Sequence, residues 1–316
     1  MSVSFVIPLY NCLPLTQAML VSLQATLPAG LEHEIILVDD GSTDGTRDWL
    51  ATLGSGFRVV LNERNLGYAG ANNRGVAAAT KEIVALLNND LVLTPRWLEP
   101  MLAVHRRSGP RAGLTGNVQI DARTGQVDHS GIFINLKGKP EHERREAQGW
   151  STLLHGFHVA DAVTGACVLL ARATWDKLGG FDEGFRNGGE DVDLCFRAQQ
   201  AGLLNAVADR SVIRHHVSSS PGRALRNEEN SRRLTLRWRR ELVDCAARHW
   251  CRHYYELSPL ETGTHGHGFQ FGVWLHTIGL RRDPPPATLA AMRRIIDAAV
   301  DVELARWTEL LGPVIS

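Results

Sequence analysis

The sequence predicts a doubly wound, mostly parallel α/β sheet in the first two thirds of the chain, followed by a helical segment. Strand and helix patterns alternate about every 25 residues as far as Asp90, and such alternation is typical of βαβ units. From about Asn227 onward, the strand patterns give way to helical, arginine-rich ones. The break RRDPPP at 281–286 separates a last helix from those before it.

The elements of the first half follow one another in a regular order. Each expected strand is an apolar run, and each expected helix repeats its apolar residues at a spacing of three or four. In chain order, they are strand 2–10, helix 13–27, strand 33–40, helix 41–53, strand 57–63, helix 70–80 and strand 82–90. Ser42 or Thr43 would cap the second helix. From about residue 117 to 150 the pattern becomes irregular and rich in turns.

The composition excludes several classes of protein. The 34 basic residues balance the 34 acidic ones, so no general attraction to nucleic acid is expected. The five cysteines include no Cys-x-x-Cys pair, which favours a reducing compartment. The first residues lack the basic and apolar regions of a signal peptide, and no window offers the roughly 18 uninterrupted apolar residues of a membrane span. The sequence therefore predicts a soluble, cytoplasmic protein with no nucleic-acid partner.

Two common nucleotide-binding motifs are missing from the places where they would act. A dinucleotide fingerprint needs Gly-x-Gly-x-x-Gly directly after the first strand, where this chain reads PLYNCLP. A P-loop needs Gly-Lys-Ser/Thr, and the only Gly-Lys is followed by Pro140. A dehydrogenase of the Rossmann type and a P-loop kinase are therefore both disfavoured.

Acidic residues stand at the ends of two expected strands. Asp39 and Asp40 end the second strand, and Asp90 ends a later one. Ligands of parallel sheets bind at the carboxyl ends of the strands, where one acid can accept hydrogen bonds from a base or ribose and another can hold a divalent cation. Mg²⁺ and Mn²⁺ prefer such oxygen ligands. The alternative, that the acids only cap the following helices, is favoured for Asp44 and stays open for the others.

A second acidic cluster occurs in RNGGEDVDLCFRAQQAG at 186–202. Glu190, Asp191 and Asp193 follow a glycine pair at the start of an expected helix. Acids in a first helical turn complement the helix dipole, but three within four residues exceed what a cap requires. These carboxylates are candidates either to hold a ligand or to remove a proton.

Seven motifs, taken together and in order, resemble a known family. They are VSFVIPLYN, ILVDDGSTDGT, NERNLGYAGANNRG, LLNNDLVL, VTGACVLLARATWDKLGGFDE, GEDVDLCFRAQQAG and IRHHVSSS. From about Ser2 to Ser220 the chain resembles the inverting family 2 glycosyltransferases, whose fold is the GT-A variant of the doubly wound sheet. NLGYAGANN and TGQVDHSGIFI look most like the bacterial polysaccharide branch that is often labelled rhamnosyltransferase.

The resemblance implies a donor site and a metal site. The residues implied at the donor nucleotide are Pro8, Tyr10, Asp39, Asp40, Asn65, Gly67, Asn73, Asn88 and Asn89. Asp90 matches the last acid of the family's Asp-x-Asp motif and would bind Mn²⁺ or Mg²⁺, together with His215 or, with a shift of one position, His216. Asn88 replaces the first acid of that motif in many members, although its amide oxygen can still act as a ligand.

The resemblance also implies an acceptor site. Asp191 matches the catalytic base and Glu190 would orient the acceptor, while Gly165 and Ala166 would form a close backbone wall beside the donor sugar. Asp193 would cap its helix or bind Arg197 one turn on. His129, in a motif typical of the branch, is expected to be a packing residue.

The expected organisation is a catalytic domain over 1–220 and a helical extension over 221–316. The donor half would cover about 1–116 and the acceptor half about 117–220. Residues 231–257 form a basic amphipathic helix, which either docks on the catalytic domain or lies on an anionic membrane at the inner face. The apolar face of the last helix suits either core packing or a homodimer.

The leading hypothesis is an inverting, metal-dependent glycosyltransferase of bacterial surface polysaccharide synthesis. It would take a nucleotide-diphosphate sugar, dTDP-rhamnose or a UDP-sugar, and transfer the sugar to a glycan or lipid-linked glycan. One alternative is a catalytically weak nucleotide-sugar-binding partner of another transferase, suggested by Asn88. A second alternative is a hydrolase in which water replaces the acceptor.

Overall fold

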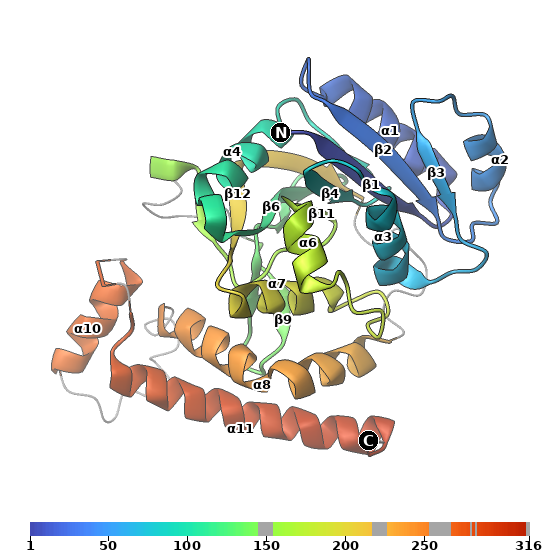
Figure 1. Cartoon of the computed structure of the whole chain (residues 1–316). Coiled ribbons are helices and arrows are strands. Elements are labelled where there is room, and N and C mark those ends of the chain that lie inside the picture. The colour runs from blue at the N-terminus through green and yellow to red at the C-terminus, as the bar shows by residue number, and fades with distance from the viewer. Residues whose placement is uncertain (145–153, 217–225, 253–266, 279, 282, 314–316) are drawn as a thin grey trace. The chain divides into compact units, whose positions relative to one another are not determined.

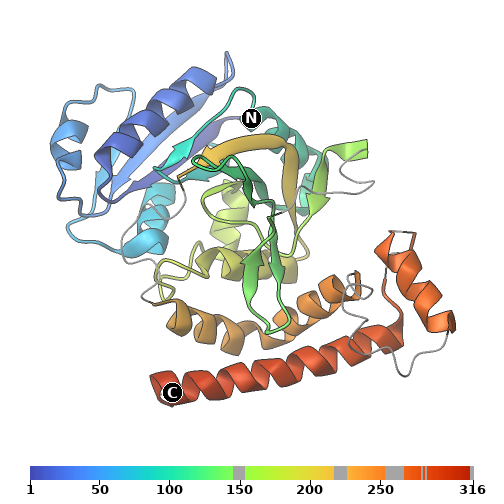
Figure 2. The ribbon, with the colours of Figure 1, turned by 180° about the vertical axis from the view of Figure 1, so that it is seen from behind.

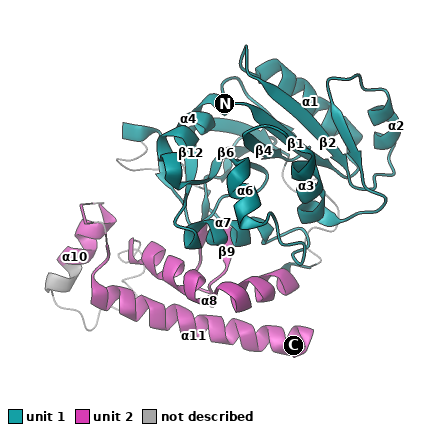
Figure 3. Ribbon diagram, in the orientation of Figure 1, with its two compact units in different colours: residues 1–132, 142–227 teal, residues 133–141, 228–316 magenta. Residues whose placement is uncertain are grey.

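The computed structural model describes residues 1–144, 154–216, 226–252, 267–278, 280–281 and 283–313. The chain divides into two compact units (Figure 3). Unit 1 comprises residues 1–132 and 142–227, and unit 2 comprises residues 133–141 and 228–316. The boundary expected near Pro221 lies outside the described residues.

Figure 1 shows the order of the elements. The strands are β1 (Val3–Leu9), β2 (His33–Asp39), β3 (Arg58–Leu61), β4 (Ile83–Leu87), β5 (Leu91–Val92), β6 (Ala112–Asp121), β7 (Val127–His129), β8 (Ile132–Ile134), β9 (Pro140–His142), β10 (Phe157–Val159), β11 (Cys167–Ala171) and β12 (Leu204–His215). The helices are α1 (Leu13–Thr26), α2 (Thr46–Ala51), α3 (Gly67–Ala78), α4 (Leu98–Ser108), the 3-10 turn η1 (Gly109–Arg111), α6 (Arg172–Leu178), α7 (Glu190–Gln200), α8 (Asn227–Arg252), α10 (His267–Thr277) and α11 (Pro286–Leu311).

The main sheet of unit 1 is mostly parallel, as the sequence predicts. Its strand order is β10-β12-β6-β11-β4-β1-β2-β3. β1 runs parallel to β2 and β4, β2 parallel to β3, and β6 parallel to β12. β11 lies between β4 and β6 and is antiparallel to both. This reversed strand places the segment that precedes it beside the carboxyl end of β4.

Helices cover both faces of this sheet, and the side chains of β1 alternate accordingly. Phe5 and its odd-numbered neighbours belong to one apolar cluster with Met19 and Leu23 of α1. Val6 faces the other way, against Gly75 of α3. Figures 1 and 2, which view the ribbon from opposite sides, show α1 and α3 on opposite faces.

Some local expectations need correction. The helix expected over 41–53 begins only at Thr46, so Ser42 and Thr43 lie in the preceding turn. Asp44 instead accepts hydrogen bonds from Thr46 N (3.2 Å) and from Leu13 N (3.0 Å), at the starts of α2 and α1. The capping role expected for Asp44 is thus confirmed.

Two other element predictions differ from the structure. The helix expected over 70–80 begins at Gly67 and ends at Ala78. The stretch expected to be irregular from about residue 117 contains the end of β6 and the short strands β7, β8 and β9. Their shortness, with at most three residues in each of the last three, explains why no clear alternation marks them.

Unit 2 is built from helices and from residues 133–141, which form the tip of the β8–β9 hairpin. In α8 the apolar residues Leu234, Trp238 and Leu242 are buried, and the helix is kinked at Trp238. Trp307 of α11 is completely buried. The expected last helix after Pro284 is confirmed as α11.

The hairpin residues 133–141 join unit 2 through polar contacts. The indole of Trp250 donates to Ile134 O (3.2 Å), and Lys139 pairs with Glu303 of α11 (2.8 Å). The ammonium group of Lys139 also lies 4.9 Å from the centroid of the Trp307 ring. These contacts tie the hairpin to both long helices.

The arginines of α8 are engaged in part by α11. Arg239 forms ion pairs with Asp297 (2.8 Å) and Asp301 (2.7 Å), and Arg293 of α11 pairs with Asp244 of α8 (2.7 Å).

The described residues include no helix with both the length and the apolar character that crossing a bilayer requires.

Candidate active site

The ends of several strands meet at one edge of the sheet. Leu9 at the end of β1 is paired with Asp39 at the end of β2, and Cys167 at the start of β11 is paired with Leu87 at the end of β4. Asn88 N, just beyond β4, donates to Ala166 O (2.8 Å). Segments far apart in the sequence therefore converge here, as the strand-end rule predicts.

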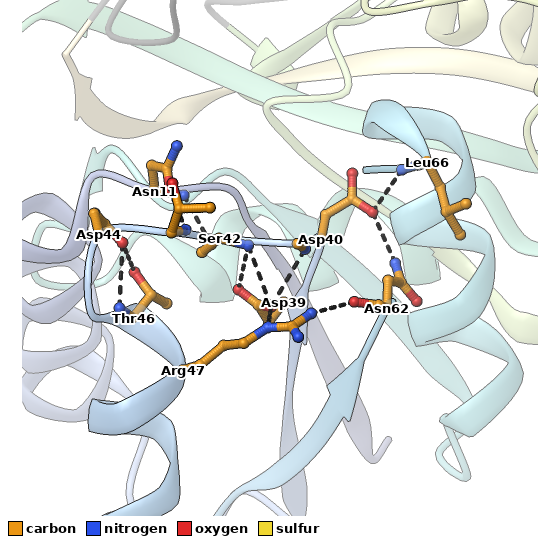
Figure 4. Close-up of polar contacts among 11 residues, drawn as sticks. Asn11, Asp39, Asp40, Ser42, Asp44, Thr46, Arg47, Asn62 and Leu66 are labelled. Carbon is orange, nitrogen blue, oxygen red and sulfur yellow. Dashed lines mark hydrogen bonds and ion pairs between the residues drawn. The ribbon is translucent and has the colours of Figure 1, made fainter. Parts of the chain in front are cut away.

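The carboxylate of Asp39 is completely buried and organises the turn after β2 (Figure 4). It accepts hydrogen bonds from the backbone N–H groups of Gly41 (3.3 Å) and Ser42 (3.2 Å). The Nε atom of Arg47, on α2, donates to the same carboxylate at 2.6 Å. Arg47 was not among the residues singled out from the sequence.

Asp40 performs the same task for the loop after β3. Its carboxylate accepts from Asn62 Nδ2 (2.8 Å), Leu66 N (2.9 Å) and Gly67 N (2.9 Å), and Figure 4 shows it turned toward Leu66. Both strand-end acids thus shape the loops around the sheet edge. Their direct contact with a base or ribose stays a prediction.

The turn after β1 is held by asparagines. Asn11, which has a left-handed backbone conformation (φ 57°), accepts from Thr43 N (2.8 Å) and donates its own N–H to Ser42 Oγ (2.9 Å). Asn89 Nδ2 donates to Thr16 Oγ1 (2.9 Å) and so links the loop after β4 to α1. Asn89 therefore supports the loop structurally.

The aromatic ring at the end of β1 is accessible. Tyr10 is 44% exposed, directly beyond the half-buried Pro8 and the buried Leu9. An exposed ring at the sheet edge can stack on a nucleobase, since every base presents a π face. The predicted place of Pro8 and Tyr10 in a donor loop is compatible with this position.

Of the three residues predicted near the donor nucleotide in this part of the chain, Asn65 and Gly67 lie at the sheet edge where the strands end. Asn65 Oδ1 accepts from Gly67 N (3.0 Å), so both lie in the turn held by Asp40. The side chain of Asn73 is engaged elsewhere, because it accepts from Phe181 N (2.9 Å) and donates to Phe181 O (3.0 Å). Its predicted contact with a nucleotide has no support from these bonds.

Asp90 and His215 form a buried pair with unused ligand atoms. The end of β12 is paired with β5, at His215 and Leu91, so His215 Nε2 lies 3.2 Å from Asp90 Oδ1. The two residues are 4% and 7% exposed. Neither Asp90 Oδ1 nor either ring nitrogen of His215 makes a hydrogen bond, and the same holds for the buried Oδ1 of Asn88.

These atoms fit a divalent cation better than they fit a protein interior. Buried polar atoms without a partner are costly, and a carboxylate oxygen and an imidazole nitrogen are ordinary ligands of Mn²⁺. Across the part of the chain that the structure describes, no three His, Cys, Asp or Glu residues form a complete metal site.

The acidic cluster at the start of α7 separates into three environments. Asp193 is completely buried and binds Arg197 (2.7 Å), as one of its two expected roles requires. Glu190 is buried and accepts from Gly188 N (2.7 Å). Asp191 is the only one of the three that is not fully buried.

Asp191 is held against the backbone wall that precedes β11. Its Oδ2 accepts from Gly165 N (2.9 Å), and its Oδ1 accepts from Val192 N (2.8 Å). Each bond uses one lone pair of one carboxylate oxygen, so each oxygen can still accept a hydrogen bond from a further donor. The structure thus brings together the predicted base and the predicted wall.

His129 supports the same wall from inside the protein. Its Nε2 accepts from Gly131 N (3.2 Å) and lies 3.5 Å from Thr164 N. Complete burial, reinforced by the nearby ring of His142, holds the pKa of His129 well below its ordinary value. Its complete burial agrees with the packing role that the sequence predicts for this residue.

Comparisons with known proteins agree with this geometry. Residues 4–160 match the family model described as Glycosyl transferase family 2. The uncharacterized protein y4gI of Sinorhizobium fredii is 33% identical over 79% of this chain and 28% of its own length. The O-antigen biosynthesis protein RfbC of Myxococcus xanthus is 30% identical over 59% of this chain and 15% of its own length. The chain therefore spans less than a third of either relative.

A further relative and a solved structure complete the comparison. The N-acetylglucosaminyl-diphospho-decaprenol L-rhamnosyltransferase of Mycobacterium tuberculosis is 26% identical over 60% of this chain and 68% of its own length. The crystal structure of GalNAc-T7 with UDP, GalNAc and Mn²⁺ has a TM-score of 0.62 at 18% identity, covering 77% of this chain and 50% of that one. The predicted GT-A fold is confirmed, and the chain contains a glycosyl transferase family 2 domain.

Proposed function

We propose that this protein is an inverting glycosyltransferase that moves a sugar from a nucleotide-diphosphate donor to a hydroxyl of a glycan or lipid-linked glycan. The observation that carries the proposal is the partly exposed Asp191, whose carboxylate is held 2.9 Å from Gly165 N beside the strand edge where Asp90 and His215 lie. Bacterial surface polysaccharide is the proposed product class, supported by the O-antigen and rhamnosyltransferase names of two relatives.

The proposed reaction is a single displacement at the anomeric carbon. The acceptor hydroxyl attacks from the side opposite the leaving diphosphate, and Asp191 removes its proton as the new bond forms. A positioned base of this kind contributes about 10²–10⁴-fold to the rate. Glu190 would orient the acceptor, and the backbone of Gly165 and Ala166 would line the donor sugar.

Asp90 and His215 would hold Mn²⁺ or Mg²⁺, and the Oδ1 atom of Asn88 would lie near it. The cation supplies charge neutralisation for the diphosphate. The proposed donor is dTDP-rhamnose or a UDP-sugar. A lipid-linked acceptor would bring the enzyme to the inner face of the membrane, which the decaprenol-linked substrate in one relative's name supports.

The first test is a thermal-shift titration with UDP, GDP, dTDP and CDP, each with and without Mn²⁺. A ligand at 100 times its Kd stabilises the folded state by about 2.7 kcal/mol. We expect one nucleotide to raise Tm, more so with Mn²⁺, and we expect Asp90→Ala to remove the effect of the metal. No shift with any nucleotide would refute the donor site.

The second test separates the base from the donor site. Asp191→Asn should keep the nucleotide-dependent shift while transfer falls by about 10²–10⁴-fold. Asp176→Asn, which changes an exposed carboxylate on α6, is the matched control and should transfer normally. If Asp191→Asn transfers sugar at the wild-type rate, another group is the base. Shift without transfer in the wild type would favour the alternative of a nucleotide-sugar-binding partner.

A further inference from the structure

Tyr68 contacts both of the segments that flank Asp191. Its hydroxyl donates to Gly165 O (2.7 Å), and its backbone N–H donates to Asn187 Oδ1 (3.0 Å). Gly165 is the residue whose N–H binds Asp191, and Asn187 lies in the loop just before α7. Tyr68 lies 97 residues from Gly165 and 119 from Asn187 in the sequence, so only the fold unites them.

The ring of Tyr68 is fixed independently of its hydroxyl. It packs on Phe181 with a centroid distance of 5.7 Å, and Phe181 packs edge-on against Trp175 at 5.0 Å. The contact with Gly165 is close enough that a Cβ atom there would lie 2.9 Å from the hydroxyl oxygen. The glycine therefore admits the tyrosine, and the tyrosine fixes the glycine's carbonyl.

We propose that Tyr68 is a positioning residue for the base, acting through Gly165. The hydroxyl anchors the carbonyl of Gly165, the N–H of the same residue anchors Asp191 Oδ2, and Asn187 ties the tyrosine backbone to the loop that begins the helix of Asp191. Ala166 O accepts from Asn88 N on the other side (2.8 Å). The turn at Gly165 and Ala166 is thus held between the donor loop and the base.

This inference rests on the proposed function, in which Asp191 is the base. The decisive variant is Tyr68→Phe, which removes one oxygen atom and keeps the ring contacts. We expect kcat to fall by about 10- to 100-fold, because a displaced Asp191 carboxylate is no longer aligned with the acceptor hydroxyl. The KM for the donor and the nucleotide-dependent Tm shift should stay unchanged. In the Asp191→Asn background the same change should have no further effect on the residual rate.

A merely structural tyrosine would behave differently. It would raise the donor KM, or reduce the rate by the same factor in both backgrounds, and either result overturns the inference. The matched control is Thr26→Val, which deletes another hydroxyl that donates to a backbone carbonyl, that of Ser22 (2.7 Å). It should leave kcat at the wild-type value.

Amide exchange tests the link without relying on activity. In Tyr68→Phe, the amide of Gly165 should exchange faster with solvent than in the wild type, because its anchor is released. Unchanged exchange would overturn the inference even if transfer is slow. If the wild type transfers no sugar to any acceptor, the proposed function fails, and the exchange measurement still decides whether Tyr68 holds the turn.

Discussion

Hydrogen bonding determines which carboxylates at the sheet edge are available for chemistry. Asp39 is occupied by Arg47 and the turn after β2, whereas Asp193 is occupied by Arg197. Asp191 is bonded only to backbone N–H groups and is partly exposed, and Asp90 Oδ1 makes no hydrogen bond. The residue type alone does not tell the available acids from the occupied ones, because all of them lie at the end of a strand or in the first turn of a helix.

Burial of His129 makes the stability of the fold depend on pH. Below about pH 6.5 the unfolded chain takes up a proton at this residue that the folded chain does not, so stability is lost as the pH falls. One such group changes the unfolding free energy by at most about 1.4 kcal/mol per pH unit. We expect His129→Gln to show a shallower loss than the wild type between pH 6.5 and 5.

Urea denaturation at half-unit pH steps measures this slope. His33→Gln, which replaces an exposed imidazole on β2, is the control and should keep the wild-type slope. A His129→Gln slope identical to that of the wild type would show that His129 titrates normally in the folded protein.

At the scale of elements, the candidate site depends on how α3 packs against the sheet. Gly75 faces Val6 of β1 and Val38 of β2, where a Cβ atom would lie 2.3 and 2.8 Å from their methyl groups. These distances are far shorter than ordinary carbon contacts of about 3.5–4.0 Å. The close approach sets the position of the start of α3, including Tyr68 in its first turn.

Gly75→Ala should push α3 away from the strands. Overpacking of this kind costs about 1–3 kcal/mol of unfolding free energy, which urea denaturation measures. Gly54→Ala is the control, because a Cβ atom there would meet nothing within 4 Å, and its stability should be unchanged or raised. A fully stable Gly75→Ala would mean that the helix has room to shift.

The apolar strands and the convergence of their ends can be predicted from the sequence, because both depend on local pattern and on the general geometry of parallel sheets. The bond from Leu13 N to Asp44, 31 residues away, cannot be predicted in this way, because neither segment alone indicates it. The bond between Tyr68 and Gly165 is likewise invisible in either motif alone. Polar contacts between residues far apart in the chain are thus the part of the structure that the local sequence pattern does not predict.

At the scale of the whole molecule, unit 2 gathers chain from two separate regions. Residues 133–141 interrupt unit 1 in sequence but belong with α8 and α11. Lys139, Glu303 and the buried Trp307 ring form the contact between the hairpin and the last helix. Helical periodicity predicts α8 and α11 well, but it carries no information about a hairpin that joins them.

Trp307→Ala should therefore weaken unit 2 selectively. Removing a buried tryptophan side chain costs about 3–5 kcal/mol, so calorimetry should show a lower Tm. All residues of the candidate site belong to unit 1, and we expect the nucleotide-dependent Tm shift to persist in the variant. Trp274→Ala, at a half-exposed ring on α10, is the control and should melt near the wild-type temperature.

The divided origin of unit 2 has a consequence for biosynthesis. The hairpin leaves the ribosome long before α11, which starts at Pro286. At about 5–20 residues per second, its partners arrive of the order of ten seconds later. Until then Lys139 lacks its ion-pair partner Glu303 and the ring of Trp307. A nascent chain released before α11 would therefore expose this hairpin to aggregation and proteolysis, however well unit 1 had folded.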